Sequence, residues 1–180
     1  MNMQEAAERA DAMLDATIKA VVPEIHWSHH VTTAGNCVVN RRRAVMTIIS
    51  EQRRGSLLGV IERFWKKSGY TITSVNTDPE NPAIFARTPE DFQIDLTIGA
   101  KGQAFFEVQT PCVQESEVAE PTTKPNGPNY AGQEIPYPNV RSDFWSTTGT
   151  AASPSTGPIP GGTHEVDTTY PEDRSRPPGA

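Results

Sequence analysis

The stretch GSLLGVIERFWKKSGYTITSV at residues 55–75 decides the fold, because it encodes a helix, a stop signal and a strand in succession. Apolar residues recur in it at intervals of three and four, as on one face of a helix: Leu57, Leu58, Ile61, Phe64 and Trp65. Ser56 is expected to cap the helix N-terminus, and Gly69 to end the helix in a left-handed conformation. The β-branched residues of 70–75 then predict a half-buried strand. Helix and strand are therefore expected to pack together in one domain.

Before this stretch, the sequence predicts one further helix and two strands. Residues 3–22 have an apolar stripe at helical spacing, and Pro23 ends it. Because much of that stripe is alanine, we expect this helix to pack loosely on the domain or to act as a spacer. Residues 25–33 and 43–49 predict strands, since apolar and β-branched residues alternate or cluster in both.

After residue 75, three more segments predict strands, at residues 83–87, 92–98 and 103–110. Short turns rich in Gly, Pro and Asp separate them, which is typical of an antiparallel meander. The predicted fold class is therefore α+β. We expect an antiparallel sheet of five or six strands packed against one central amphipathic helix, with an N-terminal helix and a disordered tail added.

Composition divides the chain near residue 113. Of the 16 prolines, 12 lie after Thr110, and the sequence beyond residue 113 is rich in Gly, Ser, Thr and acidic residues. Such a segment buries too little apolar surface to offset the entropy of ordering its chain. We therefore expect an N-terminal helix (1–23), an α+β domain (24–113) and a mostly disordered, Pro-rich acidic tail (114–180).

Charge divides at the same place. Residues 1–113 have 12 basic and 13 acidic side chains and residues 114–180 have 4 and 9, so the tail supplies most of the net charge of −6. This balance does not indicate a nucleic-acid binder, which normally has a basic surplus. No apolar run is long enough to span a membrane, so any membrane contact would come through an anchor absent from this sequence. The acidic start also lacks the features of a signal peptide, which by itself predicts a cytoplasmic protein.

Aromatic residues interrupt the tail between residues 130 and 145. Tyr137, Phe144 and Trp145 are the candidates for contact with a partner, because aromatic side chains often anchor interfaces. The same side chains could instead dock on the chain's own domain, or be scattered along a disordered linker. Residues 146–180 predict low-complexity chain without a fold.

Two cysteines, Cys37 and Cys112, lie near the two ends of the predicted strand region. If paired, they would close a loop of about 75 residues and stabilise the fold by roughly 4 kcal/mol on the chain-entropy model. The alternative is a pair of buried free thiols. Their separation is not that of a Cys-x-x-Cys redox motif.

A basic segment between residues 41 and 67 contains eight basic and two acidic side chains. The candidate anion-binding residues lie on and just before the central helix: Arg53, Arg54, Arg63, Lys66 and Lys67. Arg53 and Arg54 are expected immediately before the helix N-terminus, whose free amides also attract anions such as a phosphate headgroup or a wall polymer. The alternative is a solvated basic face neutralised by the acidic tail.

The residues that could perform chemistry form no convincing catalytic pattern. His26, His29 and His30 are the only histidine cluster, but on a strand His29 points away from the other two, so we predict no metal site. No carboxylate has the apolar neighbours that would raise its pKa, and no phosphate-binding loop predicts a cofactor. The region of Arg53, Arg54 and His26 is the best enzyme candidate, and an enzyme is the weaker class of hypothesis.

The segments AVMTIISEQRRGSLLGVIERFWKKSGY at residues 44–70 and GAKGQAFFEVQTPCV at residues 99–113 resemble uncharacterised lipoproteins and secreted proteins of actinomycetes. The resemblance covers the domain and not the tail. Members of that family carry a signal peptide with a lipobox cysteine ahead of this region, and the present sequence has no such cysteine at its start. The resemblance implies export, which favours a disulfide between Cys37 and Cys112. It implies no activity and no catalytic residues.

These features together predict a non-enzymatic binding or accessory module of the cell envelope, the mature part of a lipoprotein. Its ligand would be an envelope protein, a peptide or an anionic molecule. The alternatives are a cytoplasmic regulatory module with a partner-binding tail, and an enzyme with an unrecognised site. A deep pocket with convergent polar groups would favour the enzyme, and a shallow surface beside the central helix would favour binding.

Overall fold

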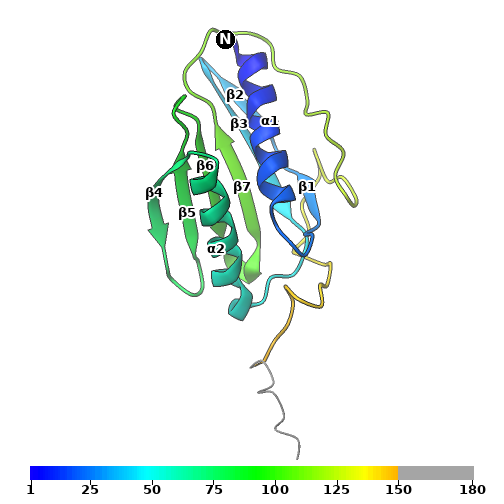
Figure 1. The fold of residues 1–180 in the computed structure, drawn as a ribbon. Coiled ribbons are helices and arrows are strands. Elements are labelled where there is room, and N and C mark those ends of the chain that lie inside the picture. Colours follow the sequence, from blue (N-terminus) through cyan, green and yellow to red (C-terminus); the bar gives the residue numbers. More distant parts are fainter. Residues whose placement is uncertain (150–180) are drawn as a thin grey trace, which may run out of the picture. The chain divides into compact units, whose positions relative to one another are not determined.

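An antiparallel sheet of seven strands is the frame of residues 1–149, the part of the chain that the computed structural model describes. The strands are β1 (Trp27–His29), β2 (Thr33–Gly35), β3 (Val38–Val45), β4 (Thr71–Asn76), β5 (Ala83–Arg87), β6 (Gln93–Ile98) and β7 (Ala104–Gln109). Their order across the sheet is β1-β3-β7-β6-β5-β4. Strand β2 lies off this path and pairs with β3. Strands β5, β6 and β7 form the predicted meander, with β3 inserted between β1 and β7 (Figure 1).

Two helices cover one face of this sheet, α1 (Met3–Lys19) and α2 (Glu51–Lys67) (Figure 1). A short 3-10 helix (Ala100–Gly102) joins β6 to β7. The core lies between the helices and the sheet, because alternate residues of β6 and β7 point their apolar side chains toward the helices. The fold class is α+β as predicted. The sheet has seven strands rather than five or six, and two helices cover it rather than one.

Helix α1 packs closely on β3 and β7, and not loosely as its alanines predict. Ala6, Ala7 and Ala10 are fully buried, with Leu14 further along the same face. Small side chains let the helix approach the sheet, so the alanines produce a close contact instead of a weak one. Asn2 begins the helix with a capping box that includes Glu5.

Helix α2 starts at Glu51 after Ser50, six residues before the start that a cap at Ser56 predicts. Ser56 therefore lies inside the helix, where it is exposed and cannot act as its cap. The predicted apolar stripe is confirmed: Leu57, Leu58, Ile61 and Trp65 are buried, and Phe64 is partly buried. Gly69 follows the helix at φ +83°, the predicted left-handed stop.

The strands before α2 differ from the prediction. The segment expected as one strand at 25–33 contains only β1 and the start of β2, while β3 begins at Val38 rather than at residue 43. Residues 40–43 are Asn-Arg-Arg-Arg, a charged sequence that does not indicate a strand. Two of these arginines are nevertheless buried, because they pair with acidic residues of α1. Strand β4 is an edge strand and mostly exposed, not half-buried.

Residues 114–149 run along the domain with defined contacts, which differs from the predicted disordered tail. Met3 N–H donates to the Gln114 carbonyl, and Thr47 forms a bridge with Val140. Trp145 is 1% exposed and its indole N–H donates to the Pro23 carbonyl at 2.7 Å. Of the alternatives for the aromatic residues of this segment, docking on the domain is the one that the structure contains. The predicted disorder of residues 150–180 lies outside the described residues. Within residues 1–149, neither helix has the length and apolarity needed to cross a membrane.

Candidate functional site

The five candidate anion-binding side chains lie at both ends of α2. Because the helix begins at Glu51, Arg53 and Arg54 belong to its first turn rather than preceding it. Arg53 Nε donates to the Phe144 carbonyl at 3.1 Å, and Arg54 Nη1 donates to the carbonyls of Pro79 and Glu80. These guanidinium groups therefore fasten two loops to the helix.

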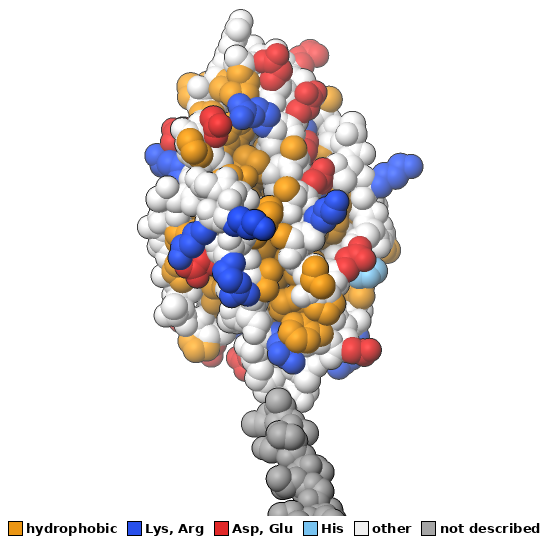
Figure 2. Space-filling view, in the orientation of Figure 1, with side chains coloured by type: hydrophobic (Ala, Val, Ile, Leu, Met, Phe, Trp, Pro, Cys, Tyr) orange, Lys and Arg blue, Asp and Glu red, His pale blue; other side chains and the backbone are white. Residues whose placement is uncertain are grey.

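The remaining members of the set occupy the last two turns of α2, about 15–20 Å farther along at 1.5 Å per residue. Lys66 pairs with Glu62 at 2.6 Å, and Lys67 is exposed. Figure 2 shows basic side chains spread over this side of the molecule rather than gathered at one point. The five side chains do not converge.

The predicted partner-contact residues also separate. Trp145 is buried, so it holds residues 138–146 against the domain and is not available to a partner. Phe144 is 36% exposed beneath the Arg53 guanidinium, and Tyr137 is 55% exposed with Lys101 Nζ 4.3 Å from its ring centroid. Only Tyr137 and Phe144 of the three present a ring to solvent.

Cys37 and Cys112 are joined by a disulfide, the pairing that the resemblance favours. Cys37 lies in the turn before β3, and Cys112 follows β7, the neighbouring strand. The bond therefore links the two ends of the predicted strand region. Disulfides persist mainly in oxidising compartments outside the cytoplasm.

Asp11 and Asp15 of α1 form a charged cluster with Arg41 and Arg43 of β3, in which both arginines are buried while Asp15 is 41% exposed. No sequence pattern indicates this cluster. Arg41 Nε lies 3.2 Å from Asp11, and Arg43 Nη2 lies 2.6 Å from Asp15. Burial raises the pKa of Asp11 against the opposing effect of Arg41, and burial lowers the pKa of Arg43. Several of the facing atoms lack aligned hydrogen bonds, among them Arg43 Nε and Nη1. The cluster holds α1 in register on the sheet.

The predicted opposition is confirmed for His29 and His30, whereas His26 precedes β1. His29 faces the helices, where its Nε2 lies 2.6 Å from the Thr123 carbonyl, so that nitrogen carries the proton and donates. Burial lowers the pKa of His29 and keeps the ring neutral. His30 contacts Phe105 on the opposite face of the sheet. Within residues 1–149, no three His, Cys, Asp or Glu side chains converge as metal ligands would.

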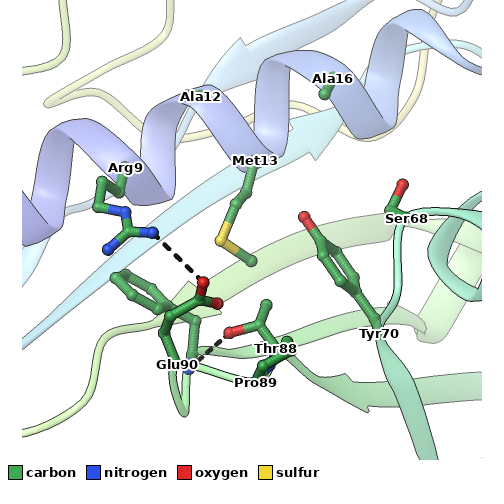
Figure 3. A pocket seen from close by; sticks show the side chains of 10 residues that line it. Arg9, Ala12, Met13, Ala16, Ser68, Tyr70, Thr88, Pro89 and Glu90 are labelled. Carbon is green, nitrogen blue, oxygen red and sulfur yellow. Dashed lines mark hydrogen bonds and ion pairs between the residues drawn. The ribbon is translucent and has the colours of Figure 1, made fainter.

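An open groove of about 410 Å³ lies beside α1, beyond the C-terminal end of α2 and against the turn between β5 and β6 (Figure 3). Ala12 and Ala16 form its α1 wall, and both are small and exposed. Its floor is apolar, with the fully buried Phe92 and the partly buried Met13. We call this feature the α1 groove. It exists because α1 presents alanines where larger side chains would fill the space.

Arg9 and Glu90 border one end of the α1 groove. Their side chains are 3.7 Å apart and each is about half exposed, so solvent screens the pair. The Arg9 guanidinium also lies 5.4 Å from the centre of the Phe92 ring. Because this pair is weak, the Arg9 guanidinium can leave Glu90 and donate to an acceptor on a ligand instead.

Tyr70 borders the opposite end, with its hydroxyl directed toward α1 (Figure 3). Burial, assisted by the Glu90 charge, raises the pKa of this hydroxyl, so it stays a neutral donor. No other residue within 1–149 hydrogen-bonds to it. A half-buried tyrosine hydroxyl usually has a partner, so this one is available to a ligand.

No protein-family model and no curated protein matches the sequence. Solved structures with a weak similarity include LppA, a candidate lipoprotein of Mycobacterium tuberculosis, and a DUF4853 family protein of Actinomyces odontolyticus ATCC 17982. The first has a TM-score of 0.39 and 13% identity over 62% of this chain and 78% of that chain. The second has a TM-score of 0.36 and 9% identity over 65% of this chain and 71% of that chain.

These scores are too low to establish membership of a family. The function of the present chain therefore has to be derived from its own surface. The sequence contains one signal for the α1 groove: alanines on the exposed side of α1, next to an apolar methionine, where polar residues are usual.

Proposed function

We propose that this protein is a binding module of the cell envelope that holds a short peptide segment of a partner protein in the α1 groove, and that it is not an enzyme. The observation that carries the proposal is the groove itself, an open hollow beside the two helices with an apolar floor and polar groups at its two ends. An apolar peptide side chain would rest on Phe92 and Met13.

Polar atoms at the two ends of the groove match the groups of a peptide backbone. The Tyr70 hydroxyl can donate to a carbonyl, and Arg9 can donate to a second carbonyl or to a carboxylate. The lining contains Thr88 and Ser68, but their hydroxyls already contact Phe92 N–H and the Phe64 carbonyl. This lining offers recognition without an activated nucleophile or a general base beside one.

The extracytoplasmic location is supported by the disulfide between Cys37 and Cys112. A disulfide of this kind is rare in reducing cytoplasm. The cytoplasmic regulatory alternative would leave both cysteines reduced. We accordingly propose that the protein acts outside the cytoplasm, as the folded part of a lipoprotein.

Site-specific photo-crosslinking in the native host tests this function. A benzophenone amino acid in place of Ala12 reacts with any chain seated in the α1 groove, and the same amino acid in place of the exposed Ala131 serves as the matched control. We expect a discrete adduct of one added mass from position 12 and none of that mass from position 131. Adding Ala16→Leu, which fills the groove, should reduce the adduct at least fivefold.

Two outcomes would contradict the proposal. One is an adduct of the same mass and yield from both positions, which indicates non-specific contact. The other is an adduct from position 12 that Ala16→Leu leaves unchanged, which places the partner outside the groove.

A further inference from the structure

The face of the sheet that the helices leave uncovered carries a row of charged and aromatic side chains. Arg42, Glu107, Asp95 and Phe85 lie directly opposite one another on β3, β7, β6 and β5. Side chains at such positions have Cβ atoms about 5 Å apart and interact across the strands. The row is thus a continuous strip across four strands, with Ser74 of β4 opposite Phe85 at its end.

Asp95 is the member of this row that lacks a partner. Arg42 forms an ion pair with Glu107, which uses the charge of both. Asp95 makes no hydrogen bond or ion pair with another described residue. Its side chain is partly buried among its neighbours. The two carboxylates therefore face each other across β6 and β7, and the single guanidinium is already taken. The strip therefore has two carboxylates and only one guanidinium.

An open groove of about 510 Å³ provides access to Asp95. We call it the sheet groove; its walls include Ser74, Phe85, Glu107 and Gln109. The Phe85 ring is 37% exposed beside the carboxylate, and Ser74 of the edge strand lies opposite Phe85. Arg87 also borders this groove, but its guanidinium pairs with Asp91 at 2.9 Å.

We propose that the sheet groove binds a basic side chain, lysine or arginine, of a partner protein. The cation would pair with Asp95, and the aliphatic stem would lie along Phe85. Long basic side chains commonly bury their stem on an apolar surface while the charged head meets a carboxylate. The face of an aromatic ring adds a further attraction for the cation. This surface lies on the opposite side of the sheet from the α1 groove, so the proposal is independent of the peptide site.

The charge state of Asp95 agrees with this geometry. Burial and the neighbouring Glu107 raise the pKa of Asp95 to about 7, with Arg42 opposing them. The titratable and charged groups around it are Glu107 and Arg42 in the row, Arg87 on β5, and His30 beside Phe105. Burial lowers the pKa of His30. A bound cation favours the ionised carboxyl, so binding should lower the pKa of Asp95, and affinity should rise as the pH passes through 7.

NMR titration of the full chain with blocked tripeptides tests the proposal. The probes are acetyl-Gly-Arg-Gly-amide and acetyl-Gly-Lys-Gly-amide, with acetyl-Gly-Gln-Gly-amide as the neutral control, all at pH 8. We expect saturable shifts of the Phe85, Asp95 and Glu107 amides with both basic probes and an affinity at least fivefold weaker with the neutral probe. The side-chain carboxyl carbon of Asp95 should titrate at a lower pH when a basic probe is bound.

Asp95→Asn should weaken binding of the basic probes at least fivefold, whereas Glu120→Gln, which removes one exposed carboxylate elsewhere, should not. The unmodified protein at pH 5 provides the same test without a substitution, because Asp95 is then protonated while the probes stay charged. Equal binding of the neutral probe, or full affinity in Asp95→Asn, would overturn the proposal. Methylguanidinium that binds as tightly as the arginine probe would assign the groove to small organic cations and overturn the protein partner.

Discussion

At the scale of single residues, Trp145 decides how the chain after β7 is held. Its ring is fully enclosed, and its indole N–H finds an acceptor 122 residues earlier, at Pro23. Composition predicts disorder for this segment because prolines and acidic residues surround the aromatic ones. A single buried tryptophan can outweigh that composition, since it removes a large apolar surface from water.

Replacing Trp145 by Ala should lower the free energy of unfolding by about 3–5 kcal/mol, as for other large-to-small changes in a core. Phe144→Ala, one position earlier and partly exposed, should cost less than about 1 kcal/mol. Urea denaturation of both variants measures the difference. Equal losses from the two substitutions would show that Trp145 is not an anchor.

Asp95 adds a dependence of stability on pH. Its pKa in the folded state is about 7, above the ordinary value of 3.8, so the folded state holds the proton more tightly than the unfolded state does. Below pH 4 both states are protonated and the group has no effect. As the pH rises from about 4 to 7, the unfolded state loses the proton that the folded state retains, so stability falls over this range and levels off above pH 7.

We therefore expect Asp95→Asn to stabilise the protein relative to the unmodified chain at pH 8, by on the order of 1–2 kcal/mol after solvent screening. The gain should disappear at pH 4. Glu120→Gln is the control and should show no such trend. A gain at pH 8 that persists unchanged at pH 4 would contradict a raised pKa at Asp95. The prediction that no carboxylate has surroundings that raise its pKa is therefore wrong for Asp95, because its neighbours are on other strands.

At the scale of elements, the sequence predicts what local periodicity encodes. The alternation of β6 and the stripe of α2 place their buried residues correctly, because each pattern is complete within one segment. The start of α2 was missed since its first turn is charged and Gly55 resembles a boundary. The first five residues of β3 were missed, because Arg41 and Arg43 become core residues only when α1 supplies Asp11 and Asp15.

Helix α1 gives a direct test of this element-level reading. Ala10 is fully buried against the sheet, whereas Ala12, two residues later, is exposed and borders the α1 groove. Ala10→Leu should destabilise the fold by about 1–3 kcal/mol through overpacking. Ala12→Leu should change the free energy of unfolding by less than about 0.5 kcal/mol. Thermal and urea unfolding of the two variants would reveal a loosely packed helix if their effects were alike.

At the scale of the whole molecule, different residues of the described part of the chain stabilise the fold and form the proposed binding site. The disulfide, the charged cluster and Trp145 fix the helices and the flanking segments on the sheet. A 75-residue separation between the cysteines corresponds to roughly 4 kcal/mol on the chain-entropy model. The α1 groove includes none of these stabilising residues, and its polar atoms are available to a ligand. Its position follows from the packing of α1 beside the turn at residues 88–90, which no local pattern encodes.

The most direct test of the central claim is an NMR titration of the full, disulfide-bonded chain with acetyl-Leu-Ala-amide. Its leucine side chain suits the floor of the α1 groove, and its three carbonyls offer acceptors to the groove's donors. The account predicts saturable shifts at the Met13 methyl group and at the amides of Tyr70 and Phe92, which Ala16→Leu abolishes and Ala131→Leu does not. Shifts that never saturate, or that survive in Ala16→Leu, would contradict a peptide site in the α1 groove.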